Sequence, residues 1–194
     1  MWTCNIGSRT CTFCPNEKIS FSSNSGILDV EKKQEYLYLN FPADTLHQIE
    51  ISKQIINGLG EKPLELYKGR DDFLAILENE ETIASVSPNM EILSKLPSRG
   101  IIVSAQGNET DFVSRFFAPQ AGIPEDPVTG SAHTTLIPYW SKRLAKPDLQ
   151  ARQISKRGGS LVCRNLELNN RVEIGGKAIT YMEGEILLKW QNVA

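Results

Sequence analysis

One short stretch combines residue types that suit proton transfer on an anionic substrate. Asp126 precedes Pro127, and a proline biases the residue before it toward extended backbone. Gly130 and Ser131 follow at the start of a predicted helix, where free backbone N–H groups and the helix dipole attract a carboxylate or phosphate. Gly130 lets a ligand approach the backbone, and Ser131 can cap the helix or bind the same anion. An acid beside such a helix end is suited to moving a proton on a substrate that carries a carboxylate.

The same stretch has a simpler interpretation, a capped helix after a rigid turn, which local physics alone favours because caps outnumber active sites. His133 lies in the first helical turn and could contact a bound anion or take part in proton transfer. The alternative for His133 is packing beneath the loop or facing solvent. We favour that alternative, because the sequence shows neither a partner histidine nor a metal pattern around it.

Regular elements flank this stretch and hold it in place. A strand is predicted over residues 111–117, which are rich in aromatic and β-branched side chains, and a helix is predicted over residues 131–144. Pro138 falls inside the helix and removes one backbone hydrogen bond, so we expect a bend there. Helical spacing predicts that the helix buries Leu136, Tyr139 and Trp140. The loop between strand and helix is stiffened by three prolines, Pro119, Pro124 and Pro127.

The rest of the chain predicts short strands with two further helices. The strands are expected over residues 17–30 with a turn at 25–26, then 36–41, 64–67, 72–77, 101–105, 149–155, 160–164, 171–174 and 178–188. The helices are expected over residues 44–59 and 87–96. Residues 31–35 predict a charged turn, and further turns are expected at 158–159, 169–170 and 175–176.

Length and composition are those of a soluble globular protein. The 194 residues allow one ordinary domain, or one and a fraction. A net charge of −2 argues against nucleic-acid binding through a basic surface. No apolar run reaches transmembrane length, and the first residues do not form a secretory signal. Four cysteines in a chain of this size are no disulfide scaffold, so we expect a cytoplasmic protein with no membrane partner.

Three of these cysteines crowd into the first fifteen residues. Cys11 and Cys14 have the spacing of half a zinc site or a redox pair, with Cys4 nearby, but no second pair follows. The remaining soft ligands are distant in the sequence: Cys163, His47 and His133. Untethered thiols are therefore favoured over a structural zinc site, and no metal is expected.

The segments Asp111–Pro119 and Gly122–His133 form a distinctive signature, which residues 67–73, 138–140 and 157–159 continue within a span from about residue 17 to residue 187. This signature closely resembles that of the PhzF-like family, the phenazine-biosynthesis-like isomerases. The resemblance implies the α+β diaminopimelate-epimerase-like fold, in which two similar domains each wrap a curved mixed sheet around a central helix. The active site of such proteins lies between the domains. The best-studied member isomerises a dihydro-hydroxyanthranilate by proton transfer, without metal or cofactor.

Carried onto this sequence, the resemblance makes Asp126 an assisting acid. It makes Gly130, Ser131, Ala132 and His133 substrate-binding residues. Full-length members also have a first domain with a Ser-Glu-Thr-Ala-Phe-like segment, whose glutamate is the principal proton-transferring residue, and a Gly-His-Ala segment. Neither segment occurs in this sequence. We therefore expect residues 1–41 to be a leader and a remnant of the first domain, 42–180 the second domain, and 181–194 a C-terminal strand and tail.

Two functional hypotheses follow from these observations. In the first, the chain is a cofactor-independent isomerase of a small carboxylate-bearing substrate, impaired by the missing glutamate. In the second, it is an inactive domain of the same family that binds a ligand or partner. A zinc-linked interaction module rests on the leader cysteines alone. A homodimer is expected, because full-length members are commonly dimers and because loss of the first domain would expose apolar surface and unpaired strands.

Overall fold

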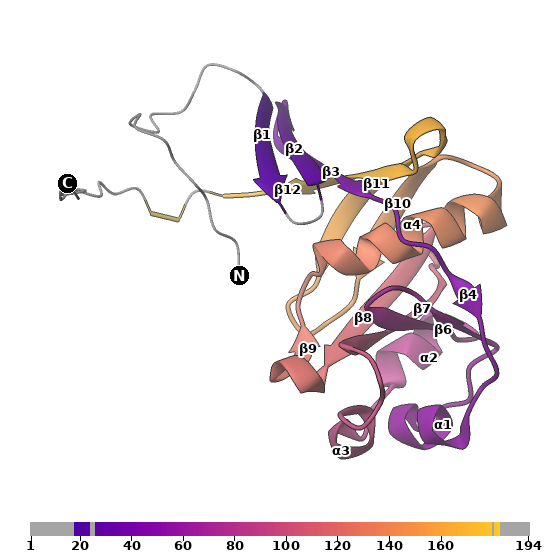
Figure 1. Ribbon diagram of the computed structural model, residues 1–194. Coiled ribbons are helices and arrows are strands. Elements are labelled where there is room, and N and C mark those ends of the chain that lie inside the picture. Colours follow the sequence, from indigo (N-terminus) through magenta and orange to yellow (C-terminus); the bar gives the residue numbers. More distant parts are fainter. Residues whose placement is uncertain (1–17, 24–25, 180, 183–194) are drawn as a thin grey trace, which may run out of the picture.

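A single large sheet dominates the computed structural model, which describes residues 18–23, 26–179 and 181–182 (Figure 1). Its strands are β1 (Lys18–Ser23), β2 (Gly26–Lys33), β3 (Tyr36–Pro42), β4 (His47–Gln48), β5 (Glu65–Lys68), β6 (Asp72–Ile76), β7 (Gly100–Gln106), β8 (Phe112–Ala118), β9 (Ile123–Asp126), β10 (Asp148–Gln153), β11 (Gly159–Leu166) and β12 (Arg171–Lys177). The helices are α1 (Lys53–Leu59), α2 (Glu80–Ser85), α3 (Met90–Leu93) and α4 (Gly130–Leu144), with short 3₁₀ turns at Pro119–Ala121 and Glu167–Asn169.

The strands follow the order β1-β2-β3-β12-β11-β10-β8-β7-β6-β5-β4, and β9 pairs with β8 beside this path. The pairs β6–β7 and β8–β10 are parallel, and the other described pairs are antiparallel. The sheet is therefore mixed. The predicted antiparallel meander is found in β10, β11 and β12, which continues into β3.

Helix α4 lies in the concave side of this sheet and organises its core (Figure 1). Leu136 and Trp140 are 0% and 2% exposed, and Tyr139 is partly buried. The Trp140 indole stacks on Phe112 with ring centroids 5.8 Å apart, and its Nε1–H donates to Ser104 Oγ at 2.9 Å. The prediction of an α+β fold with a curved mixed sheet around a central helix is confirmed. Pro138 lies inside α4, which continues past it to Leu144.

The three shorter helices cover the opposite face of the sheet and enclose a second apolar core. Their buried side chains, including Ile55 of α1, Ile83 of α2 and Leu93 of α3, pack against β6, β7 and β8. Each helix begins at a side-chain cap: Ser52 accepts from Ile55 N–H, Asn79 from Thr82 N–H and Asn89 from Ile92 N–H. The middle strands of the sheet are thus buried on both faces, which explains their continuous apolar sequences.

The prediction of a helix over residues 44–59 was wrong in its first half, because α1 begins only at Lys53. Asp44 bonds elsewhere: its carboxylate accepts from the Arg70 N–H at 3.2 Å and from the Thr135 hydroxyl at 3.0 Å. A Cβ on Gly69 would lie 2.2 Å from Asp44 Oδ2, so the close approach of this carboxylate requires glycine there. Asp44 therefore joins the β5–β6 turn to α4 instead of capping a helix.

Other boundaries also differ from the predictions. The charged turn at residues 31–35 is shorter, because β2 continues to Lys33. The turn at 175–176 is absent, since Gly175 lies within β12 beneath the Tyr38 ring, where a Cβ would come within 2.6 Å of a ring carbon. Helix α2 and strand β9 were not predicted. The strand expected over 178–188 lies largely outside the described residues, and the described residues among them, 178, 179, 181 and 182, are not in a strand.

Replacing Leu136 by alanine tests the central position of α4. The side chain is fully buried, so Leu136→Ala should lower the free energy of unfolding by about 2–5 kcal/mol. Leu64 is 60% exposed, and Leu64→Ala should change it by no more than about 0.5 kcal/mol. Urea denaturation of both variants measures the difference. Equal effects would contradict the core assignment.

Candidate active site

Asp126 is the last residue of β9, the strand that folds back on β8 in a hairpin. The hairpin is clamped by Arg115 of β8, whose Nε and Nη2 donate to the two Glu125 carboxylate oxygens at 2.7 and 3.1 Å. Arg115 Nη1 also donates to backbone carbonyls at the end of α2, including that of Val86 at 2.8 Å. The extended backbone expected for Asp126 is present, and the Arg115–Glu125 pair ties its strand to the body of the protein.

Beyond Asp126 the chain enters α4 through a short loop, which is held by hydrogen bonds from neighbouring side chains. Thr129 Oγ1 donates to Asp126 Oδ2 at 2.6 Å. The fully buried Gln153 at the end of β10 accepts from Thr129 N–H at 2.8 Å and donates to the Asp126 carbonyl at 2.7 Å. Ser155 Oγ donates to the Pro127 carbonyl at 2.7 Å. The loop is therefore fixed by the side chains of Gln153 and Ser155, which lie 24 to 28 residues further along the sequence than the groups they bond.

The N-terminus of α4 carries no side-chain cap from its N-cap residue Thr129. Gly130 and Ser131 are exposed, and a Cβ placed on Gly130 would meet nothing within 4 Å. The capping role considered for Ser131 is not observed, since its hydroxyl accepts from Arg99 Nη2 at 3.0 Å. The first turn of α4 thus lacks a side-chain cap from Thr129 and begins with two exposed residues, which allows an anion to approach its N–H groups.

Arg99 is a residue of this surface that the sequence analysis missed. Its Nε donates to Asp72 Oδ1 at 3.0 Å and its Nη2 to the other Asp72 oxygen, and Asp72 is buried. Hydrogen bonding to Asp72 raises the pKa of Arg99, with smaller contributions from Asp71 and Asp126. A fixed guanidinium therefore lies beside Ser131 and near Asp126. The only sequence signal for Arg99 was a basic residue directly before a buried strand. The distance in sequence between Arg99 and Asp126 gives no indication that the two lie close together.

Ala132 and His133 lie beneath this surface. His133 is 0% exposed, and its Nδ1 is 2.8 Å from the Thr129 carbonyl, to which its N–H donates. Burial lowers the pKa of His133 to about 4, so the ring is neutral near pH 7. Ala132 is likewise buried, with 1% of its surface exposed. The structure thus groups Asp126, Gly130 and Ser131 with Arg99, and places the imidazole underneath, as the packing interpretation of His133 expected.

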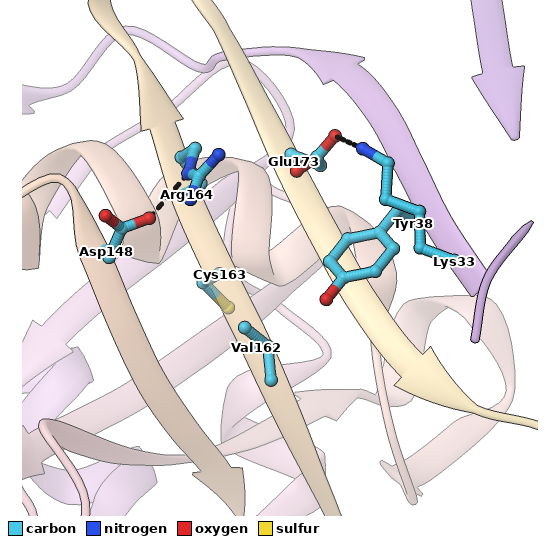
Figure 2. A pocket seen from close by; sticks show the side chains of 7 residues that line it. All are labelled: Lys33, Tyr38, Asp148, Val162, Cys163, Arg164 and Glu173. Carbon is cyan, nitrogen blue, oxygen red and sulfur yellow. Dashed lines mark hydrogen bonds and ion pairs between the residues drawn. The ribbon is translucent and has the colours of Figure 1, made fainter. Parts of the chain in front are cut away.

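Two hollows in the surface do not contain this group. The one in Figure 2 has a volume of about 170 Å³ and lies on the outer face of β3, β12 and β11. Its charges are paired, Asp148 with Arg164 at 2.5 Å and Lys33 with Glu173 at 3.4 Å. The other, of about 490 Å³, lies between residues 106–111 and the start of β10. Neither hollow is lined by Asp126 or by the first turn of α4.

Comparison with known proteins assigns the fold and this motif to one family. The family model described as "Phenazine biosynthesis-like protein" matches residues 5–184. The chain belongs to the PhzF family. The match begins before residue 17, where the sequence resemblance was placed, so most of the leader also fits the family pattern.

Relatives in this family are longer than the chain. An "uncharacterized isomerase" of Pseudomonas aeruginosa is 46% identical over 174 residues, which cover 90% of this chain and 66% of the relative. A PhzF-family crystal structure from Enterococcus faecalis has a TM-score of 0.83 and 46% identity, with 90% of this chain and 66% of that one covered. The chain thus spans just under two thirds of the length of these relatives.

A more distant neighbour shows the fold alone. It is a predicted epimerase of P. aeruginosa with a TM-score of 0.60 and 13% identity, covering 90% of this chain and 68% of that one. Together with a hydroxyproline epimerase of similar fold, it supports the diaminopimelate-epimerase-like assignment.

The described part of the chain contains neither a cluster of metal ligands nor a membrane-spanning helix. No three His, Cys, Asp or Glu side chains there come together as metal ligands. Cys4, Cys11 and Cys14 lie outside those residues, so the zinc hypothesis stays a hypothesis. None of the described helices is both long and apolar enough to cross a membrane.

The buried imidazole should make stability depend on pH. Because the folded-state pKa of His133 lies near 4 and its ordinary value is 6.5, the unfolded chain binds a proton in this window that the folded chain does not. Stability from this residue is complete above pH 6.5 and is lost as pH falls toward 4, by at most about 1.4 kcal/mol per pH unit. Denaturation of His133→Gln at several pH values between 7 and 4.5 tests this. The free energy of unfolding of the variant should fall less steeply with decreasing pH than that of the wild type. The exposed His47 provides the control, His47→Gln, which should keep the wild-type slope. Equal slopes in all three proteins would contradict this assignment.

Proposed function

We propose that the chain carries one side of a PhzF-type isomerase site, which acts by acid–base proton transfer on a small carboxylate-bearing substrate without metal or cofactor. The observation that carries the proposal is the uncapped N-terminus of α4 beside Asp126 and Arg99. The substrate carboxylate would accept from the backbone N–H groups of Gly130 and Ser131 and from the guanidinium. Asp126 would then exchange a proton with the bound molecule. The isomerase names of the relatives agree with this chemistry.

We also propose that proton transfer is impaired in the 194-residue chain. An isomerisation removes a proton at one position and delivers it at another, which is fastest with an acid or base on each side of the substrate. The other titratable side chains described around Asp126 are paired or buried. Glu125 forms an ion pair with Arg115 and Asp72 forms one with Arg99, while His133 is fully buried. The glutamate segment that the family resemblance implies does not occur in the sequence.

The alternative is a catalytically inactive domain that binds a ligand or partner. It is favoured by the same anion-binding surface, which needs no second base in order to bind. In both versions we take residues 42–180 as the second PhzF-like domain, with residues 1–41 as leader and first-domain remnant and 181–194 as a final strand and tail. A cytoplasmic location and the absence of nucleic-acid partners rest on cysteine usage and net charge.

Deuterium incorporation tests the reaction. The chain, incubated with a dihydro-hydroxyanthranilate in heavy water, should give little or no exchange above the uncatalysed background, while a full-length family member serves as the positive control. Any residual exchange should fall at least about tenfold in Asp126→Asn, since that substitution removes the acid. Exchange at the rate of the full-length control would overturn the proposed impairment. It would then direct attention to Glu125 as a substitute base.

Association is expected from the exposed end of the sheet. β1 is the terminal strand of the described sheet, and its Ile19 and Phe21 are 45% and 39% exposed. Unpaired strand edges with apolar side chains favour pairing with another chain, so we expect a homodimer or larger species. Light scattering over a dilution series measures this, and Phe21→Lys should shift the equilibrium toward monomer. A monodisperse wild-type monomer at high concentration would contradict the expectation.

A further inference from the structure

Gln153 is a buried polar side chain that the proposed reaction does not itself use. It occupies an inward-facing position of β10, where Leu149 and Ala151 before it are apolar core residues. An amide buried at such a position lowers stability unless its donors and acceptor are satisfied. All the described bonds of this amide go to the loop that carries Asp126: to Thr129 N–H, Thr129 Oγ1 and the Asp126 carbonyl.

The direction of each hydrogen bond in this group is determined. Gln153 Oε1 accepts from Thr129 N–H at 2.8 Å, so the other end of the amide is the NH₂ group. That group donates to the Asp126 carbonyl at 2.7 Å and to Thr129 Oγ1 at 3.2 Å. Because Thr129 Oγ1 accepts there, its own proton is free to point to Asp126 Oδ2, 2.6 Å away. The chain of donation runs from Gln153 through Thr129 to the carboxylate.

The two oxygens of Asp126 are consequently unequal. Oδ2 is bonded to the Thr129 hydroxyl, whereas Oδ1 has no hydrogen-bond partner among the described residues. A further hydrogen bond holds the loop: the buried His133 N–H donates to the Thr129 carbonyl at 2.8 Å. One oxygen is thus fixed and the other is left for a ligand.

We propose that Gln153 is a positioning residue for Asp126, acting through Thr129 so that Oδ2 is anchored and Oδ1 exchanges the proton. The inference rests on the proposed function only in taking Asp126 as the acid. Gln153 contacts no substrate in this arrangement. Its effect is to fix the rotation of the carboxylate and the path of the backbone into Gly130, where the anion would bind.

The first experiment compares Gln153→Met with Gln150→Met in the 194-residue chain. Both replace an amide by a thioether of similar length on β10, but Gln150 is exposed and faces away from the loop. In Gln153→Met, amide exchange at Thr129 N–H should accelerate about tenfold or more, because its acceptor is gone. The side-chain carboxyl ¹³C signal of Asp126 at pH 7 should also move. Gln150→Met should change neither.

A second pair covers the case in which Gln153→Met does not fold. Thr129→Val removes the hydroxyl with little change of shape, and Thr129→Ser restores it. The Asp126 carboxyl signal should move in Thr129→Val and stay near its wild-type position in Thr129→Ser. A merely structural role of the residue would not predict rescue by serine.

Binding separates this proposal from the proposed function. Anthranilate, a stable aromatic carboxylate, is titrated while the Gly130 and Ser131 amide signals are followed. We expect affinity at least about fivefold weaker in Gln153→Met than in the wild type and unchanged in Gln150→Met. If the wild type does not bind anthranilate, the proposed substrate class fails, while the Thr129 and Asp126 signals still decide the positioning role. Positioning by Gln153 is overturned if the Asp126 carboxyl signal is the same in the wild type, Gln153→Met and Thr129→Val.

Discussion

The burial of α4 in the curve of the sheet is the constraint on which the proposed site depends. Leu136 and Trp140 fix the helix against β6, β8 and β10–β12, and the Trp140 indole is held by Ser104 on β7. With its middle fixed, the start of α4 must lie where β8 turns into β9 and β7 begins. That placement brings the uncapped helix end to Asp126 and to Arg99, which immediately precedes β7.

Ion pairing then decides which charged groups remain for chemistry. Arg115 occupies Glu125, and Asp72 holds Arg99 by two hydrogen bonds while one guanidinium nitrogen reaches Ser131. Both pairs are partly buried, where opposite charges interact more strongly than at the surface. Of the three carboxylates Glu125, Asp72 and Asp126, that of Asp126 alone has no cation bonded to it among the described residues. The selection of one acid from these three neighbouring acidic groups thus follows from the surrounding network.

The sequence predicted the central helix, most strands and the motif, because each has a local pattern of spacing, propensity or turn residues. It did not predict Arg99 or Gln153, whose roles depend on side-chain hydrogen bonds to residues 27 to 32 positions away in the sequence. For Gln153, the available signal was a glutamine at an inward-facing position of β10, since buried amides need partners. The prediction of a helix from residue 44 was wrong for a similar reason. Asp44 has the residue type of a helix cap, but its carboxylate bonds to Arg70 and Thr135, which are distant in the sequence.

Binding and turnover depend on different parts of this arrangement. The groups proposed to hold a carboxylate, Arg99, Ser131 and the first turn of α4, all belong to the described chain and are fixed by its own core. Anion binding therefore requires nothing from outside them. Efficient isomerisation requires a second acid or base opposite Asp126, and each described candidate near it is paired or buried. An isomerase half-site and an inactive binding domain would consequently show the same affinity for a carboxylate, so only the rate of proton exchange distinguishes them.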